Sequence, residues 1–294
     1  MADILCIGSL LWDIIGRSPS PMQMGADLPG RITRLPGGVA LNIAAALARL
    51  GLRPALLSAV GRDAEGDELI AACGQLGIVT DHVYRSEDLP TGRYMAVEGA
   101  NGLIAAIADA HSLEAAGDRI LRPLFDGRLG REGRHWRGPI VLDGNLTQKL
   151  LSDIARTALF AKADLRIAPA SPGKAGRLLP LVTMPNATIY LNVEEAGQIC
   201  QRRFHGVEDA AKGLLEHGAR RVLVTDGGNG CADATTQGIL LATPPRVLVN
   251  RVTGAGDAFM AAHLAAETLG ADRDSALDAA LAAAARHVSG DIGT

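Results

Sequence analysis

The sequence lacks an excess of either charge and has few cysteines. Its 294 residues include 29 Lys and Arg against 32 Asp and Glu, a formal net charge of −3, with both signs scattered along the chain. The sequence therefore has neither the clustered basic residues of a nucleic-acid-binding protein nor the polybasic stretch of a membrane-surface protein. The four cysteines lie far apart, without the spacing of a zinc site or redox motif, and we expect free thiols: Cys6, Cys73, Cys200 and Cys231.

Export signals and common nucleotide-binding motifs are absent too. The N-terminus, MADILCIGSL, carries an acid where a signal peptide has basic residues. No apolar run reaches about 18 residues without a charge, so we expect a cytoplasmic protein that does not span a membrane. Neither a Walker A motif nor GxGxxG occurs, which argues against a P-loop enzyme and a dinucleotide-binding Rossmann domain.

Short apolar strands alternate with amphipathic helical segments along most of the chain. Helical periodicity covers residues 40–50 and 63–76. Strand patterns cover residues 4–8, 55–61, 140–143, 165–168, 188–192 and 221–225. Such alternation predicts an α/β fold with a mainly parallel sheet covered by helices on both faces. We expect one domain over residues 1–294.

Two segments interrupt this alternation. Residues 13–34 are rich in Pro, Gly and Met, and residues 91–109 alternate apolar and polar side chains. The second segment contains Asn101-Gly102, a strong signal for a β-hairpin. We expect these segments to form a small β lid, although a surface hairpin without a function fits the same pattern.

The stretch NRVTGAGDAF, residues 250–259, predicts an anion site with an acid beside it. Gly254, Ala255 and Gly256 let a ligand approach the backbone, and the unpaired N–H groups at the start of the following helix attract anions. Asp257 at the start of that helix is unsuited to binding phosphate but suited to general-base catalysis. The combination favours phosphoryl transfer to an alcohol. The simpler alternative is a tight turn in which Asp257 only caps the helix.

Three other stretches are typical of ligand contacts. In LPGGVALN, Gly37 and Gly38 admit a sugar close to the backbone, and Asn42 is able to bind its hydroxyl groups. NVEE, residues 192–195, follows a strand at the edge where open α/β sheets bind ligands. VTDGGNG, residues 224–230, is a strand that enters a glycine-rich turn suited to nucleotide phosphates.

These motifs, in this order, resemble those of the ribokinase-like (PfkB) carbohydrate kinases: Asp13 after the first strand, GGVALN, the hairpin, NVEE, VTDGGNG and VTGAGD. The resemblance covers nearly the whole chain. It implies a ribokinase-like three-layer α/β/α fold with a small β lid, and a kinase that uses ATP and Mg²⁺.

The resemblance also implies roles for individual residues. Asp257 is the expected catalytic base, with Gly254, Ala255 and Gly256 as the anion hole. The expected sugar-binding residues are Asp13, Gly37, Gly38 and Asn42. The expected nucleotide-binding residues, among which Glu195 holds Mg²⁺ through water, are Asn192, Glu195, Thr225, Gly227, Gly230 and Thr253.

Within this family, four stretches of the sequence are most similar to those of pseudouridine kinases: GGVALNIAAALARLG, VLDGNLT, IAPASPGKAGRL and VNRVTGAGDA. This similarity implies transfer of the ATP γ-phosphoryl group to the 5′-hydroxyl of a C-nucleoside, with Thr91, Tyr94 and Asn145 near the ribose or the base. Two alternatives stay open. One is a relative that acts on ribose, a fructose-type sugar, adenosine, uridine or cytidine, and the other is a non-catalytic nucleoside sensor.

Three further expectations concern the surroundings of this site. Arg251 stands where the family usually has Asp or Asn, beside a loop that often binds a monovalent cation, so we expect weak activation by K⁺. His287 is expected to be packed or at the surface rather than to bind a ligand. The apolar side chains and free edge of the lid predict a homodimer formed through the lid.

Overall fold

The computed structural model describes residues 2–131, 133–250 and 253–290. Its centre is an eight-stranded sheet in the order β14 (Gly238–Ala242), β13 (Cys231–Thr235), β12 (Arg221–Thr225), β11 (Ala187–Asn192), β10 (Leu165–Ala168), β9 (Ile140–Asp143), β1 (Ile4–Ile7), β4 (Pro54–Leu57). Strands β12 to β4 run parallel, and β13 and β14 form an antiparallel edge.

The order of the strands indicates where a ligand binds. From β1 the chain passes to β4 on one side and later to β9 on the other, so the winding direction reverses between β1 and β9. In open α/β sheets, ligands bind beyond the carboxyl ends of the strands at such a reversal. Here those ends are the residues directly after Ile7 and Asp143.

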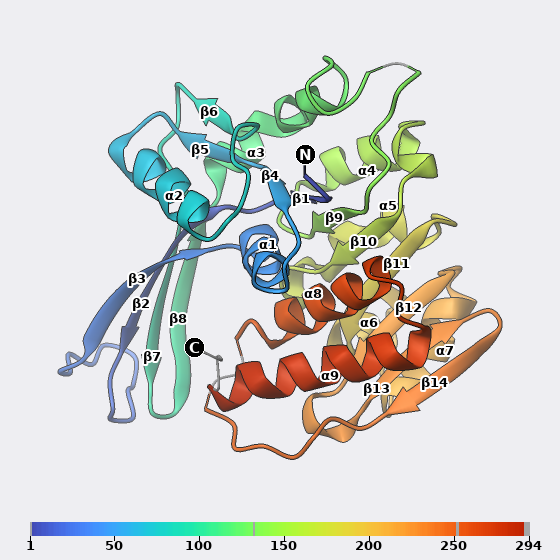
Figure 1. The fold of residues 1–294 in the computed structure, drawn as a ribbon. Helices are drawn as coiled ribbons and strands as arrows, with labels where there is room; N and C mark the ends of the chain where they lie inside the picture. Colours follow the sequence, from blue (N-terminus) through green and yellow to red (C-terminus); the bar gives the residue numbers. More distant parts are fainter. Residues whose placement is uncertain (1, 132, 251–252, 291–294) are drawn as a thin grey trace.

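Helices cover both faces of the sheet (Figure 1). One face carries α1 (Val39–Arg49), α2 (Ala64–Gln75), α8 (Ala255–Thr268) and α9 (Arg273–Ser289). The other carries α3 (His111–Ala116), η1 (Gly117–Leu124), α4 (Gln148–Arg156), η2 (Phe160–Lys162), η3 (Pro172–Leu178), α5 (Leu179–Val182), α6 (Val193–Cys200) and α7 (Val207–Glu216). The predicted α/β class with three layers is confirmed.

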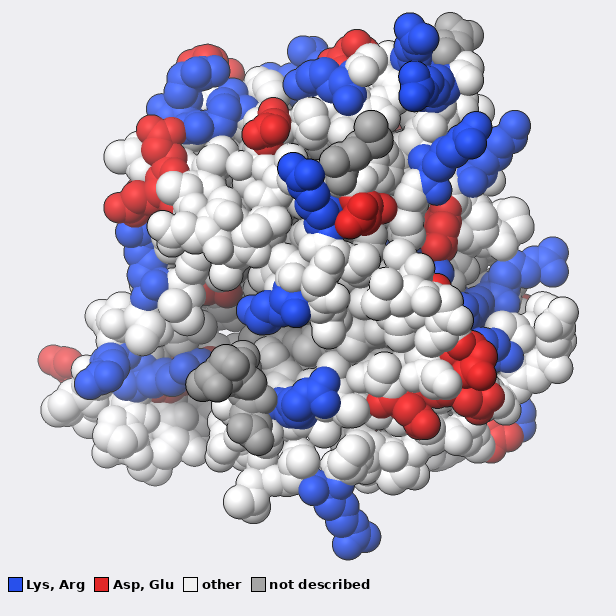
Figure 2. Space-filling view, in the orientation of Figure 1, with Lys and Arg blue, Asp and Glu red and all other residues white. Residues whose placement is uncertain are grey.

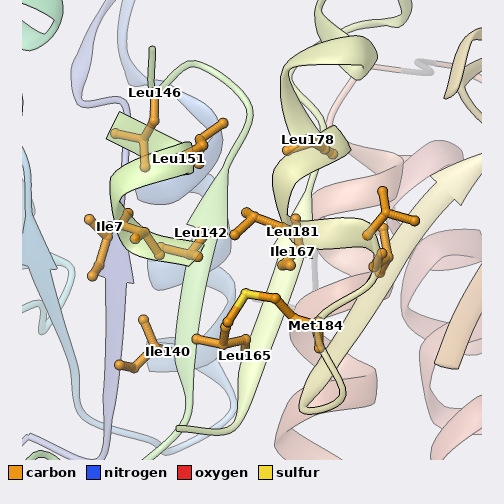
Figure 3. Close-up of a cluster of buried hydrophobic side chains, with 14 of the residues drawn as sticks. Ile7, Ile140, Leu142, Leu146, Leu151, Leu165, Ile167, Leu178, Leu181 and Met184 are labelled. Atoms are coloured by element: carbon orange, nitrogen blue, oxygen red, sulfur yellow. The ribbon is translucent and has the colours of Figure 1, made fainter. Parts of the chain in front are cut away.

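The core follows the alternation of side chains along the strands. In β1, Leu5 and Ile7 face the α4–α7 layer, while Ile4 and Cys6 face α1 and α8. Figure 3 shows Ile7 beside neighbouring strand and helix side chains in the first of these layers. Each fully buried aliphatic side chain contributes about 1.5–3 kcal/mol relative to its exposed state. The cysteines are free, as expected.

A second, four-stranded sheet stands to one side of this body (Figure 1). Its order is β3 (Arg31–Gly37), β2 (Leu11–Arg17), β7 (Arg93–Gly99) and β8 (Gly102–Asp109). Strands β7 and β8 form the hairpin predicted at Asn101-Gly102, where Gly102 has φ 101°. The two segments that interrupt the α/β alternation thus supply strands to the same small sheet.

The prediction of one strand over residues 55–61 is wrong in one respect, because the structure has two strands there. Strand β4 ends at Leu57, and β5 (Ala59–Gly61) leaves the main sheet to pair with β6 (Tyr84–Ser86). Ser58 marks the division: its hydroxyl donates to the Gly8 carbonyl at 2.5 Å and its own carbonyl accepts from the Tyr84 amide at 2.8 Å.

The molecular surface carries interspersed charges of both signs on the face seen in Figure 2. Among the described residues, no helix combines the length and the apolar character that crossing a bilayer requires.

A network of ion pairs anchors α8 to the sheet. Arg221 of β12 contacts Asp233 of β13 at 2.8 Å and Glu267 of α8 at 2.7 Å. Arg166 of β10 pairs with the same Glu267, and Asp233 is fully buried. His263, also fully buried, lies beside Arg221, and burial lowers its pKa to about 4, so the imidazole stays neutral.

We predict that Arg221→Met destabilises the protein by about 3 kcal/mol, because the buried Asp233 carboxylate loses one cationic partner and keeps the other, Arg273 at 3.1 Å. The matched control is Arg202→Met, which breaks an ion pair with Asp209 whose side chains are 49% and 39% exposed. Its expected cost is below about 1 kcal/mol. Chemical denaturation measures both values, and equal unfolding midpoints for the two variants would contradict the prediction.

Candidate active site

The glycine turn before α8 forms an open helix N-terminus. Gly254 is the N-cap residue in the left-handed conformation, with φ 85°, and no side chain caps the helix. A Cβ atom built at Gly256 meets nothing within 4 Å. The first-turn N–H groups of α8 therefore border open space, which is the arrangement that binds anions at helix N-termini.

Asp257 lies in this first turn and is held by the neighbouring helix α1. The amide of Asn42 donates to a carboxylate oxygen of Asp257 at 2.9 Å. Burial of the carboxyl group raises the pKa of Asp257 to about 7, against the effect of the Asn42 hydrogen bond, and the charges of Asp143, Asp13 and Glu195 raise it further. A carboxylate with a pKa near neutrality is suited to general-base chemistry.

The same electrostatic contacts place the predicted sugar-binding and magnesium-binding acids around Asp257. Asp13 lies on β2, and burial raises its pKa to about 6. Figure 2 shows a hollow between the small sheet and the body, with acidic atoms visible within it. The structure therefore brings residues from β2, α1, β9, α6 and α8 to one place.

The double glycine at the start of α1 has a different cause from the one inferred from the sequence. A Cβ atom at Gly37 would lie 2.1 Å from the Asp13 carboxylate, and one at Gly38, with φ 105°, would lie 2.5 Å from the Ser9 carbonyl. Side chains are therefore excluded at these two positions by Asp13 and Ser9, a cause that the sequence did not reveal, and the predicted contact of the glycines with a sugar stays a prediction. Both glycines still shape the site, because they let β2 and the end of β1 approach it.

Asp143, which ends β9, is a central residue that the sequence reasoning missed. One of its carboxylate oxygens accepts from the Ser9 amide and hydroxyl, each at 2.7 Å, and from the Ala40 amide at 3.0 Å. The predicted residue Asn145 joins this group, because its amide donates to the Ser9 hydroxyl at 3.0 Å and accepts from Lys174 at 2.7 Å. Ser9 and Lys174 were missed as well. The signal for Asp143 was its place at the carboxyl end of a predicted strand.

Asn192 and Glu195 form a capping box at the start of α6. The Asn192 side chain accepts from the Glu195 amide, and the Glu195 carboxylate accepts from the Asn192 amide, each at 2.8 Å. Glu195 is 7% exposed, and burial raises its pKa. Asn192 pairs with Thr225 across β11 and β12, so these residues share one edge of the sheet.

The described residues contain no cluster of His, Cys, Asp and Glu able to enclose a metal ion. One nearby carboxylate, Glu195, fits a Mg²⁺ ion that keeps most of its water and binds substrate phosphates, which is the usual protein environment of Mg²⁺. The residues therefore fit the expected indirect role of Glu195.

The glycine-rich turn after β12 is open at its surface. Gly227 and Gly230 have φ values of 51° and 140°, which side chains other than glycine rarely adopt. A Cβ atom at Gly227 meets nothing within 4 Å. Backbone hydrogen bonds from the Asp226 amide to the Gly230 carbonyl and from the Asn229 amide to the Asp226 carbonyl close the turn. Gly227 is exposed to a ligand, whereas Gly230 is buried at the base of the turn.

Of the two predicted acceptor contacts on the small sheet, the structure places only Tyr94 beside Asp13. These two residues are paired in the β2–β7 register. Thr91 is 1% exposed, its hydroxyl donates to Asp63 at 2.5 Å and accepts from the Gly61 amide at 3.1 Å. Asp63 is the N-cap residue of α2. This geometry gives Thr91 a structural role in place of the predicted contact with the substrate.

Thr253, predicted to contact the nucleotide, precedes the glycine turn, and its carbonyl accepts a hydrogen bond from His287 at 2.8 Å. The interpretation of Arg251 as a replacement for a monovalent cation concerns a residue outside the described ranges.

Comparisons with known proteins identify similar sequences and folds. The sequence model of the pfkB family of carbohydrate kinases matches residues 1–290. The chain is 30% identical to the pseudouridine kinase of Escherichia coli (strain K12), over 88% of this chain and 81% of that protein. A solved carbohydrate kinase from Agrobacterium tumefaciens has a TM-score of 0.81 at 27% identity, covering 100% of this chain and 93% of that one. Ribokinase from Thermotoga maritima has a TM-score of 0.78 at 23% identity, covering 98% and 93%, so the ribokinase-like fold is confirmed.

Proposed function

The chain belongs to the pfkB family of carbohydrate kinases, and we propose that it transfers the γ-phosphoryl group of ATP to the 5′-hydroxyl of a nucleoside, with pseudouridine as the acceptor. The observation that carries this proposal is the position of Asp257, held by Asn42 in the first turn of a helix whose N-terminus has no side-chain cap. A nucleoside sensor has no need of a half-buried carboxylate at an anion site. The similarity to a pseudouridine kinase supports the choice of acceptor.

In the proposed reaction, each residue has a separate task. Asp257 accepts the proton of the acceptor hydroxyl, and the N–H groups at the start of α8 bind the oxygen atoms of the transferred group. The turn with Gly227 and Gly230 binds nucleotide phosphates, and Glu195 holds Mg²⁺ through water. When bound, Mg²⁺ neutralises charge on the phosphate oxygens. Asp13 binds a sugar hydroxyl and fixes the acceptor beside Asp257.

The pKa of Asp257 predicts how activity depends on pH. A base works only when it is ionised, and with a pKa of about 7 this carboxyl is mostly protonated in mildly acidic solution. We expect kcat/KM to rise about tenfold per pH unit up to an apparent pKa near 7 and then to level off. Initial rates from about pH 5 to about pH 9 test this, and a flat profile would exclude Asp257 as the base.

The small sheet supports the proposal of a homodimer. In the β2–β7–β8 register, Met95 pairs with both Ile14 and Ile107, so these side chains share one face. The exposed apolar side chains on this face, with exposed fractions of 76%, 50%, 36% and 71%, are Ile32, Met95, Val97 and Ile107. A contiguous apolar face on a sheet is a typical protein interface.

We predict that the protein is a dimer at about 10 µM and that Ile107→Asp makes it a monomer, because a buried unpaired carboxylate costs several kcal/mol. Leu179→Asp is the matched control, since Leu179 is 39% exposed but lies at the start of α5. Size-exclusion chromatography with light scattering measures the mass of each. A monomeric parent chain would refute this interface.

The acceptor is tested by ADP release from MgATP in the presence of pseudouridine, uridine, cytidine, adenosine, ribose or fructose. We expect strong turnover with pseudouridine alone. If the protein phosphorylates only another acceptor, the proposed kinase chemistry stands and pseudouridine is replaced by that acceptor in the proposal. No turnover with any of them would favour the nucleoside sensor.

A further inference from the structure

The C-terminal end of α9 holds the segment that leads into the glycine turn. Helices α8 and α9 lie side by side, and the end of α9 is next to the start of α8 (Figure 1). The Asn250 amide donates to the Val288 carbonyl at 2.8 Å, and the Asn250 side chain donates to the Ser289 carbonyl at 2.6 Å. The last turn of α9 is therefore attached to the chain just ahead of the proposed anion site.

His287, in the last turn of the same helix, contacts the residue that precedes the glycine turn. Its Nε2 atom lies 2.8 Å from the Thr253 carbonyl oxygen. A carbonyl oxygen only accepts hydrogen bonds, so Nε2 carries a proton in either the neutral or the charged imidazole. A Cβ atom at Gly254 would lie 3.0 Å from this Nε2 atom, so the ring packs directly against the turn.

This contact orients the peptide between Thr253 and Gly254. The described peptide bonds are trans, and the carbonyl and N–H of a trans peptide point in opposite directions. With the Thr253 carbonyl fixed on α9, the Gly254 N–H points away from α9. The hydrogen bond also polarises the peptide, which strengthens its N–H as a donor.

We propose that His287 is a positioning residue for phosphoryl transfer: by donating from Nε2 to the Thr253 carbonyl, it keeps Gly254 in its left-handed conformation and holds the following N–H groups in the orientation that binds the transferred group. This role rests on the proposed kinase function. It differs from direct catalysis, because the imidazole contacts the backbone rather than the reacting atoms.

The test compares His287→Leu, which removes the donor, with His287→Gln, whose amide nitrogen reaches the position of Nε2. Arg286→Leu, a change of an exposed side chain on the same turn, is the control. For each protein we would measure kcat, KM for the acceptor, and amide hydrogen exchange in the peptide that covers residues 250–258.

We expect His287→Leu to lower kcat by about 10- to 100-fold, with KM for the acceptor within about threefold, because displaced N–H groups act mainly on the transition state. It should also speed exchange in residues 250–258, and His287→Gln should largely restore both values. Faster exchange with an unchanged kcat would overturn the proposal, and so would a Gln variant as impaired as the Leu variant.

If the proposed kinase function is wrong, these measurements give a different set of results. A parent chain inactive on every acceptor would refute the kinase assignment. The exchange comparison would then still decide whether His287 fixes the turn, since equal exchange in the parent and Leu proteins would refute that contact.

Discussion

Asp257→Asn is expected to lower kcat by about 10²- to 10⁴-fold while KM for the acceptor stays within about threefold. The amide keeps the size of the side chain and its place beside Asn42, but it does not accept a proton from the acceptor hydroxyl. The loss therefore falls on the chemical step. Steady-state kinetics measure it, and a kcat equal to that of the parent chain would show that another group is the base.

Stability distinguishes this loss from misfolding. The folded state raises the pKa of Asp257 to about 7, so its contribution to stability is present in acid and is lost as the pH rises through 7. At alkaline pH the neutral amide should make the variant at least as stable as the parent chain. Asp274→Asn, a change of an exposed acid in the first turn of α9, is the matched control and should leave kcat unchanged at a cost in stability below about 1 kcal/mol.

Gly256→Leu is expected to lower kcat/KM for ATP by about 10²-fold or more without unfolding the protein. A Cβ atom at this exposed position has no neighbour within 4 Å outside its own helix turn, so we expect the larger side chain to be tolerated in the free protein. It does occupy the space beside the first-turn N–H groups of α8, where the transferred phosphoryl group is proposed to bind. Kinetics with varied ATP concentrations measure the effect.

Gly74→Leu is the matched control for this change. Gly74 also lies in a helix and borders open space, but on α2. Both variants should melt within a few degrees of the parent chain, and only Gly256→Leu should be inactive. If both variants keep full activity, the phosphoryl group does not bind at this helix N-terminus.

The fold was largely predictable from the sequence because its main strands are short apolar runs separated by helical segments. The glycine turn before Asp257 and the NVEE stretch were recognisable for a similar reason, since each is a contiguous motif whose geometry depends on neighbouring residues. The capping box between Asn192 and Glu195 involves residues only three positions apart. Local chemistry of this kind can be predicted without a structure.

Contacts between distant residues could not be predicted in this way. The hydrogen bonds from Ser9 to Asp143 join residues 134 positions apart, so neither side chain stood out in the sequence. The reason for Gly37 is equally remote, because it depends on where the Asp13 side chain lies. Thr91 was misassigned since its partner Asp63 belongs to another element, and His287 had no recognisable role until α9 was placed beside the glycine turn.

The most direct measurement of the central claim is phosphorus NMR of the product formed from MgATP and pseudouridine. The account predicts ADP and one new phosphate ester whose phosphorus couples to the two 5′ protons of the ribose, with almost no ester formed by the Asp257→Asn variant. Release of inorganic phosphate without an ester, or equal ester formation by the variant, would contradict the account.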